Sequence, residues 1–236
     1  MKEPTVLRFH RPDRVMHFAV IVCWALLGVS GVMLGHAART GSEADMLDVA
    51  IHFAAGIALI LFVAWYFVQA PERVERLIHE IRRPDRPLLA WFRTLGGYPA
   101  ALLGNLGLSR KTPATVPQGR FNAGQRVAYA ILILCTFTLL VTGALLFSIH
   151  QPGAAAGSGG LLLTIHGLAF KAGVLVLLVH VPMALLSPAV LRAVMPGSDG
   201  RIPYAVACRH SPLWVTEDLE PHGKEPGMLV EKELRF

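Results

Sequence analysis

Long apolar stretches separated by short polar segments dominate the chain from its start to residue 187. Four stretches are long enough to cross a bilayer, because a helix needs roughly 20 mostly apolar residues to span the hydrocarbon core. They cover residues 16–35, 50–69, 127–149 and 161–187. The pattern therefore predicts an all-α integral membrane domain over residues 1–187, built as a bundle of four spanning helices.

The first apolar stretch also has features of a signal peptide, since basic residues precede it and "GHAART" follows it. Its apolar run is longer than the usual apolar core of a signal peptide, and a histidine lies at its start. We therefore expect this stretch to remain in the protein as a span.

Composition supports a membrane protein. Hydrophobic residues make up 53% of the 236 residues and charged residues only 16%, which is too apolar for an ordinary soluble domain of this length. The formal net charge of +6 is compatible with nucleic-acid binding, but the distribution of the charges indicates membrane topology instead. We expect no nucleic-acid partner.

Basic residues gather on alternate connections between the spans. The segment before the first span and the long connection between the second and third spans are rich in arginine. The connection after the first span has only Arg39 beside three acidic residues, and "HQPGAAAGSGG" after the third span has no basic residue. The positive-inside rule then places both termini and the long middle connection in the cytoplasm.

The segments outside the spans are less informative. "PERVERLIHEIRRP" has the periodicity of a short helix lying on the cytoplasmic membrane surface. Residues 188–236 are rich in proline, glycine and charge, which predicts an irregular cytoplasmic C-terminal extension. We expect no internal repeat. The three cysteines, Cys23, Cys135 and Cys208, are far apart, which argues against a disulfide framework or a cysteine metal site.

Four histidines fall on the spans at two depths. His17 lies at the cytoplasmic start of the first span and His52 at the outer start of the second. In the fourth span, His166 lies near the outer end and His180 lies deeper. At about 1.5 Å and about 100° per residue, the spacing from position 166 to position 180 returns to nearly the same helix face roughly 21 Å further along the axis. His52 therefore shares the outer level with His166. His17 shares the inner level with His180.

Ionisable side chains inside a span are costly to bury and indicate function. Two pairs of neutral imidazoles at separate depths of a four-helix bundle suit two haems b, with the iron of each bound by two histidines. A transporter of metal ions also uses histidines within its spans, but it normally adds carboxylates, which these apolar stretches lack. No C-x-x-C-H motif occurs, so we do not expect covalently attached haem.

Each of these features has a structural alternative. A single histidine in a span also forms hydrogen bonds to neighbouring helices, and His36 and His150 compete with His52 near the outer ends of spans. The remaining histidines are expected outside the bilayer: His10, His79, His210 and His222. Glycines in the spans either admit a flat macrocycle or allow close helix packing. These are Gly28, Gly31, Gly56, Gly143 and Gly173.

Several segments resemble the cytochrome b (gamma) subunit of membrane-bound respiratory formate dehydrogenases, a di-haem family similar to cytochrome b561. "DRVMHFAVIVCWALLGVSG" resembles the first span of that family, in which D-R-x-x-H has a haem ligand at the position of His17. "GRFNAGQRVAYAILILCTFTLLVTGALL" resembles the start of the third span. "LLLTIHGLAFKAGVLVLLVH" resembles the fourth span with both histidines at the family spacing, and "RHSPLW" resembles the tail motif. The resemblance covers nearly the whole chain.

The resemblance implies a respiratory complex in the bacterial inner membrane. A catalytic (alpha) subunit containing molybdopterin or tungstopterin would lie on the periplasmic side, with an iron-sulfur (beta) subunit next to the membrane. Electrons would pass from the iron-sulfur subunit through the outer and inner haems to menaquinone or ubiquinone near the cytoplasmic face. The chain would be the electron-transfer and quinone-reducing subunit of an enzyme, surrounded by membrane lipid and without activity toward formate alone.

By the same resemblance, Asn122, Gly124 and Gln125 line the quinone site, close to the inner haem. Amide side chains and a backbone N–H suit a quinone carbonyl, because they donate hydrogen bonds without adding charge. The alternative is that "FNAGQ" is a plain helix N-cap formed by Asn122. The chain also has "HVPMALL" after His180, where the family often has an aromatic residue, so the shape of the quinone pocket differs there.

Lys171 is a second departure, because it lies within the fourth span, shortly after His166. It has three alternative partners: a haem propionate, the membrane interface reached by snorkelling, or an acidic group on a partner subunit. The first and the last agree best with its position.

Other functions remain compatible with these residues. Related cytochromes b serve thiosulfate reductases, hydrogenases and sulfite-oxidising complexes, and this chain does not contain the substrate site that would distinguish them. A haem-free membrane anchor or a transporter is the alternative from a different class of protein. Haem absorption bands would separate that class from a redox protein.

Overall fold

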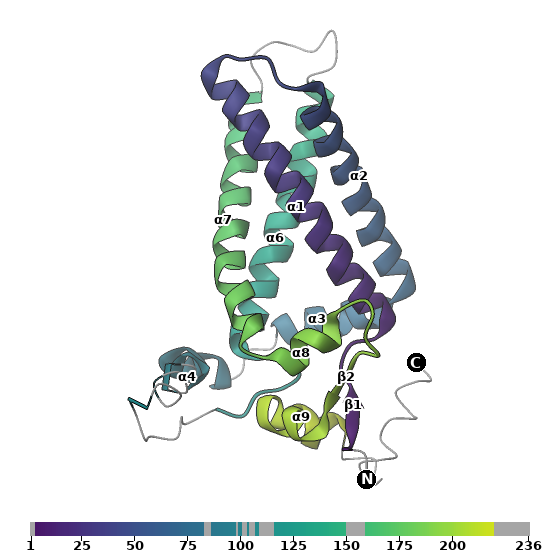
Figure 1. Ribbon diagram of the computed structural model, residues 1–236, viewed down its shortest axis with the longest axis vertical. Helices are drawn as coiled ribbons and strands as arrows, with labels where there is room; N and C mark the ends of the chain where they lie inside the picture. Colours follow the sequence, from purple (N-terminus) through teal and green to yellow (C-terminus); the bar gives the residue numbers. More distant parts are fainter. Residues whose placement is uncertain are drawn as a thin grey trace.

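Four long helices form an upright bundle in the computed structural model, which describes residues 3–82, 86–97, 99–100, 103, 107–108, 116–149 and 159–219 (Figure 1). They are α1 (Arg11–Thr40), α2 (Met46–Gln69), α6 (Ala123–Ile149) and α7 (Gly159–Leu185). All four are long and apolar enough to cross a membrane. Large apolar side chains such as Val29, Leu61, Phe137 and Leu175 are more than half exposed on their outer faces. The predicted all-α membrane bundle is therefore confirmed.

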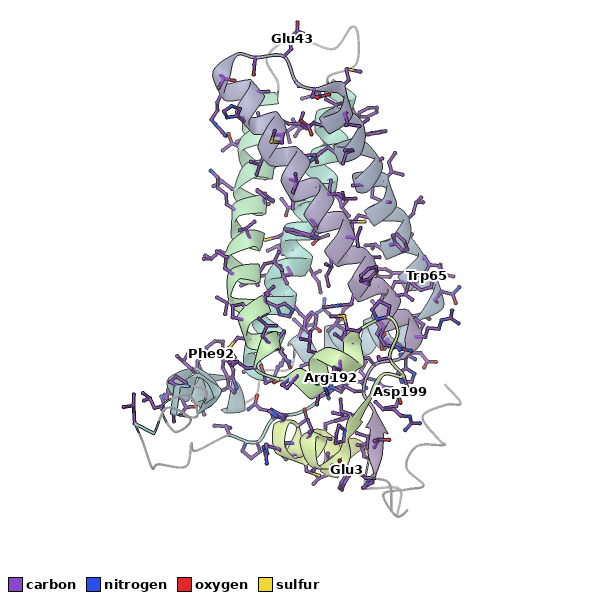
Figure 2. All side chains as sticks on the ribbon, in the orientation of Figure 1. Glu3, Glu43, Trp65, Phe92, Arg192 and Asp199 are labelled. Carbon is purple, nitrogen blue, oxygen red and sulfur yellow. The ribbon has the colours of Figure 1, made fainter. Side chains whose placement is uncertain are left out.

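The short elements gather at one end of the bundle (Figure 1). This end contains α3 (Pro71–Arg82), α4 (Arg86–Thr94) and a 3₁₀ turn, η1 (Leu95–Gly97). α3 coincides with the predicted surface helix. We name this end the strand end, because it also contains the two strands, and the opposite end, at the α1–α2 connection, the loop end. Charged side chains mark both ends in Figure 2, with Glu43 at the loop end and Arg192 and Asp199 at the strand end.

Several spanning helices begin or end at residues other than those predicted, because proline and glycine residues determine where the helical backbone stops. α1 begins at Arg11, outside the apolar stretch, and the backbone N–H of His10 donates to Asp13 Oδ2 at 3.0 Å. It ends at Gly41, whose φ of 68° is the left-handed conformation that glycine adopts readily. α7 ends at Leu185 because Pro188 starts the next helix and disfavours helical backbone before it.

The segment after α7 folds as far as Leu219, which corrects the prediction of an irregular extension. It contains α8 (Pro188–Val194), β2 (Arg201–Pro203), α9 (Tyr204–His210), α10 (Pro212–Trp214) and a π-helical turn, η2 (Val215–Leu219). β2 pairs antiparallel with β1 (Thr5–Leu7). Val6, Ile202 and Trp214 are almost fully buried in one small core, because the scattered apolar residues of both termini cover each other. Residues 220–236 lie outside the described part.

Residues 120–143 repeat residues 8–31 at a constant spacing of 112, contrary to the expectation of no internal repeat. Ser30 corresponds to Thr142. Identical pairs are Arg8 and Arg120, Phe9 and Phe121, Arg14 and Arg126, Val15 and Val127, Ile21 and Ile133, Cys23 and Cys135, Leu27 and Leu139, Val29 and Val141, and Gly31 and Gly143. α1 packs chiefly against α2, and α6 against α7. The bundle is therefore two similar helical hairpins.

The two repeats contact each other through their first residues. Arg8 Nη2 donates to the Arg120 carbonyl, and Arg120 Nη2 donates to the Arg8 carbonyl at 2.8 Å. Both guanidinium groups lie over the indole of Trp214, with Cζ 4.7 Å and 5.5 Å from the ring centroid. Because each repeat donates and accepts the same bond, the hairpins are related by approximate two-fold symmetry.

Close contacts between α1 and α7 require small residues at mid-depth. A methyl group on Gly173 of α7 would overlap the Trp24 ring of α1, and one on Gly28 of α1 would lie 3.5 Å from the Phe170 ring of α7. Gly167, also on α7, has no atom within 4 Å of such a methyl group. The two helices therefore approach each other at Gly173, while Gly167 faces open space.

Substituting Gly173 by alanine tests this contact. Gly173→Ala should destabilise the folded protein by about 1–3 kcal/mol, because the added methyl group forces the Trp24 ring out of its position. Gly167→Ala is the matched control on the same helix and should stabilise slightly, by about 0.5–1 kcal/mol, since alanine favours helix. Thermal unfolding of both variants in detergent measures the difference. Equal melting temperatures would contradict the proposed close packing.

Candidate functional site

His52 and His166 face each other toward the loop end of the bundle, from α2 and α7. Their ring centroids are 6.3 Å apart, and the ring planes are inclined by 57°. Imidazole nitrogens bind transition metals at about 2 Å, so two imidazoles on opposite sides of one metal have centroids roughly 6 Å apart. The structure thus brings together the two residues predicted for the outer level, at a spacing at which both rings would bind one metal ion.

One nitrogen of each outer imidazole contacts a hydroxyl group. Nδ1 of His52 lies 2.9 Å from Oγ of Ser30, and Nδ1 of His166 lies 2.8 Å from Oγ1 of Thr142. Ser30 is 2% exposed and Thr142 is 6% exposed, so both contacts are shielded from solvent. Since Ser30 and Thr142 correspond in the internal repeat, the two hairpins hold the two imidazoles in the same way.

The glycines that follow these hydroxyl residues leave space beside the imidazoles. A methyl group on Gly31 would lie 3.2 Å from Cε1 of His52, and one on Gly143 would lie 3.5 Å from Cε1 of His166. The first distance is tighter than most carbon contacts, so a larger residue at Gly31 would displace the ring.

The inner pair, His17 on α1 and His180 on α7, lies at the strand end. The two imidazoles are close enough for their charges to interact. In the internal repeat, Tyr129 corresponds to His17. Tyr66 follows His52 by as many residues as His180 follows His166, so Tyr66 corresponds to His180. The two-fold symmetry is therefore kept by the histidines of the outer level and broken at the inner level.

Asp13 of the DRVMH motif connects α1, α2 and α3 at the strand end. Its Oδ1 accepts a hydrogen bond from the Tyr66 hydroxyl at 2.8 Å, and its Oδ2 forms an ion pair with Arg73 at 2.9 Å. Burial, followed by the nearby Arg73 charge, lowers the pKa of His10 from 6.5 to about 4, so its imidazole is neutral at pH 7. These bonds hold the start of α1, and with it His17, against the second helix.

Two corresponding arginines are buried one turn from the inner level, Arg14 on α1 and Arg126 on α6. They are 8% and 5% exposed. Arg14 Nη1 donates to Ser198 Oγ at 3.3 Å, while its buried Nε has no hydrogen-bond partner among the described residues. A buried guanidinium needs an anion or further acceptors to compensate for lost hydration. The carboxylate of a haem propionate has the chemistry to complete this site.

The predicted quinone residues form a capping box at the start of α6. Gln125 N–H donates to Asn122 Oδ1 at 2.8 Å, and Asn122 N–H donates to Gln125 Oε1 at 3.0 Å. The N–H of Ala123 donates to Gln118 Oε1 at 2.9 Å. The capping alternative is thus realised in the fold. Both amide oxygens are used, whereas the two amide NH₂ groups make no hydrogen bond within the described ranges and are available as donors to a ligand.

Trp91 of α4 covers the same helix start. A methyl group on Gly124 would overlap the indole ring, and so would one on Gly96. Trp91 is only 8% exposed. Glycine at position 124 is therefore required by the close approach of α4 to α6, a role that the motif alone did not indicate.

Among the residues that the structure describes, His36, His79 and His210 do not join either pair. His36 lies near the end of α1, His79 is exposed on α3, and His210 ends α9. Burial and then the Arg209 charge lower the pKa of His210. His150 and His222 lie outside the described residues.

Lys171 is exposed on α7, near the middle of the span. The step from position 166 to position 171 corresponds to a rotation of about 140° around the helix, so Lys171 lies on a face different from that of the outer imidazole. This position disfavours the haem propionate as its partner and leaves the membrane interface or a partner subunit.

Sequence motifs did not single out Ser30, Thr142 or Trp91. The repeated triplets V-S-G and V-T-G were the available signal for the two hydroxyl residues, because each lies on the helix that precedes a histidine-bearing helix in its hairpin. No pattern indicated Trp91, since its partner Gly124 lies on a different helix that α4 meets only in space.

Comparison with known proteins shows the family of the chain. The chain is 24% identical over 225 residues to the cytochrome b556(Fdn) subunit of the nitrate-inducible formate dehydrogenase of Escherichia coli K12, covering 92% of this chain and 93% of that protein. The subunits of Escherichia coli O157:H7 and Shigella flexneri match equally well. The sequence profile of the prokaryotic cytochrome b561 family matches residues 8–197. Four spanning helices, paired histidines and this match together show that the chain belongs to the prokaryotic cytochrome b561 family, whose members bind haem b.

Proposed function

We propose that the chain is the di-haem cytochrome b subunit that anchors a respiratory formate dehydrogenase in the bacterial inner membrane. The observation that carries the proposal is the facing pair of His52 and His166, with 6.3 Å between the ring centroids. His17 and His180 would hold a second haem b at the strand end. Haem bound at these two levels supplies one-electron transfer across the bilayer.

The residues of this chain position the cofactors and exclude water. The four histidines are half-buried among apolar helices. The Ser30 and Thr142 hydroxyls hold the outer rings, and the buried guanidinium of Arg14 is available to a propionate. Neutral imidazoles suit this interior, because a charged group without a partner is costly in hydrocarbon.

The partners of the proposed complex follow from the relatives, which are subunits of formate dehydrogenase. An iron-sulfur subunit on the periplasmic side would donate electrons at the outer level, and a molybdopterin or tungstopterin subunit would oxidise formate. Electron movement toward the cytoplasmic side works against the membrane potential by about 2.3 kcal/mol per 100 mV. A thiosulfate reductase, hydrogenase or sulfite-oxidising complex would use the same two-level arrangement with a different catalytic subunit.

The acceptor in this proposal is a quinone, menaquinone or ubiquinone, bound beside the start of α6 near the cytoplasmic face. The capping box leaves the NH₂ groups of Asn122 and Gln125 as hydrogen-bond donors for a quinone carbonyl. Trp91 packs against Gly124 and supplies an apolar surface next to these donors.

Haem content of histidine variants tests the proposed ligands. The wild-type chain should contain two haems b, and His52→Ala or His166→Ala should remove one of them. His17→Ala or His180→Ala should remove the other, because an iron with one imidazole is bound less tightly. His36→Ala is the matched control within α1 and should keep both haems. Haem quantitation by the pyridine haemochrome method gives the count, and one haem in the wild type would refute the two-level assignment.

Substitutions at Asn122 separate capping from quinone binding. Asn122→Asp and Asn122→Ser both keep a side-chain oxygen for the Gln125 N–H, so stability should change little, whereas Asn122→Ala should lose about 1 kcal/mol. All three remove the NH₂ donor and should slow haem reoxidation by an added quinone analogue, by about a hundredfold if positioning is lost. Reoxidation at the wild-type rate in the aspartate and serine variants would mean that Asn122 acts only as a cap.

Reporter fusions test the proposed topology. A reporter joined after Phe236 should be active only in a form that works in the cytoplasm, because the basic connections lie at the strand end. A reporter inserted at Glu43, at the loop end, should be active only in a periplasmic form. The opposite result would place the histidine pairs at the reverse depths.

A further inference from the structure

Ser30 and Thr142 each make two contacts through one hydroxyl group. Ser30 Oγ lies 2.7 Å from the Leu26 carbonyl oxygen and 2.9 Å from His52 Nδ1. Thr142 Oγ1 lies 2.6 Å from the Thr138 carbonyl oxygen and 2.8 Å from His166 Nδ1. A hydroxyl group inside a helix commonly bonds to the carbonyl one turn earlier, which accounts for the first contact but not for the second.

These contacts determine which ring nitrogen carries the proton. A carbonyl oxygen only accepts, so the single hydroxyl hydrogen of Ser30 or Thr142 must be donated to the backbone. The hydroxyl oxygen is then an acceptor, and the hydrogen bond to the imidazole must be donated by Nδ1–H. A neutral imidazole has one N–H, and therefore Nε2 of His52 and of His166 has its lone pair free to bind a metal.

We propose that Ser30 and Thr142 are positioning residues that hold both ligands of the outer haem in the Nδ1–H tautomer and lower the reduction potential of that haem. The inference rests on the proposed function, because it takes His52 and His166 as the ligands. Two independent hydroxyl groups, from corresponding positions of the two hairpins, make the same bond at 2.9 Å and 2.8 Å. A chance contact would not be expected to recur at both sites.

The sign of the effect follows from the direction of the hydrogen bonds. An acceptor at Nδ1–H draws the proton away from the ring and raises the electron density at Nε2. A more basic ligand stabilises ferric over ferrous iron, so the reduction potential falls. The inner level differs, because within the described ranges neither His17 nor His180 receives a side-chain hydroxyl contact of this kind. The buried cationic Arg14 near the inner level also favours the reduced state there.

Redox titration of the full chain in membranes or detergent tests the inference. The variants are Ser30→Ala and Thr142→Val, which remove the hydroxyl at nearly constant volume, and Ser30→Thr and Thr142→Ser, which keep it. Thr164→Val is the matched control, because Thr164 Oγ1 makes the same kind of bond, to the Gly160 carbonyl at 2.8 Å, but makes no hydrogen bond to a histidine within the described part of the chain. The His52→Ala variant identifies which titration step belongs to the outer haem. Low-spin ferric EPR spectra report the angle between the two imidazole planes.

The outer haem should titrate at a more positive potential in both Ser30→Ala and Thr142→Val, because each variant lacks one of the two hydroxyl acceptors. Ser30→Thr, Thr142→Ser and Thr164→Val should keep the wild-type potential, and the inner haem should not shift in any variant. Loss of the outer haem from Thr142→Val together with its retention in Thr142→Ser would support the same role.

Unchanged potentials in both hydroxyl-free variants would overturn the inference, and so would a shift of equal size in Thr164→Val. A shift confined to the inner haem would do the same. Absence of b-type haem from the wild-type chain would instead overturn the proposed function, so the two failures are distinguishable.

Discussion

A neutral imidazole buried in an apolar bundle has a donor nitrogen and an acceptor nitrogen, and each needs a partner. At the outer level, hydroxyl groups from α1 and α6 satisfy the donor nitrogens of His52 and His166. In the proposed function, bound iron would satisfy the remaining acceptor nitrogens of both rings. Three features agree with this requirement: the pairing of helices within each hairpin, the glycines beside the imidazole rings, and the distance between the two rings.

The approximate two-fold symmetry explains why the outer level is so regular. Each hairpin supplies one histidine from its second helix and one hydroxyl-glycine pair from its first helix, so one structural solution is used twice. At the inner level the hairpins differ, because Tyr66 and Tyr129 occupy the positions that correspond to His180 and His17. The helix starts differ as well: Asp13 forms an ion pair with Arg73, whereas Gln125 is a neutral amide. This loss of symmetry creates one candidate quinone site instead of two.

The strand end holds the two hairpins in register. Arg8 and Arg120 exchange hydrogen bonds with each other's backbone and stack on Trp214, which is 1% exposed. The β1–β2 pair and α9 bury the other apolar residues around this indole. Because α1 and α6 both begin next to this cluster, it sets the relative height of the two hairpins. The small core therefore contributes to the depth at which the histidines of different hairpins meet.

The amino-acid sequence by itself determined the four spans, since a run of apolar residues long enough to cross a bilayer has few other stable conformations. The spacing of His166 and His180 likewise placed both on one face at two depths, because helix geometry is nearly constant. Three features depended on the tertiary structure. They are the hydroxyl partners of the outer imidazoles, the packing of Trp91 against Gly124, and the folding of the segment after α7. Each joins residues from different elements, and short-range periodicity does not encode which side chains meet once the helices pack. Scattered residues such as Val6, Ile202 and Trp214 became a core only when both ends of the chain met, so the composition of the tail alone suggested an irregular segment.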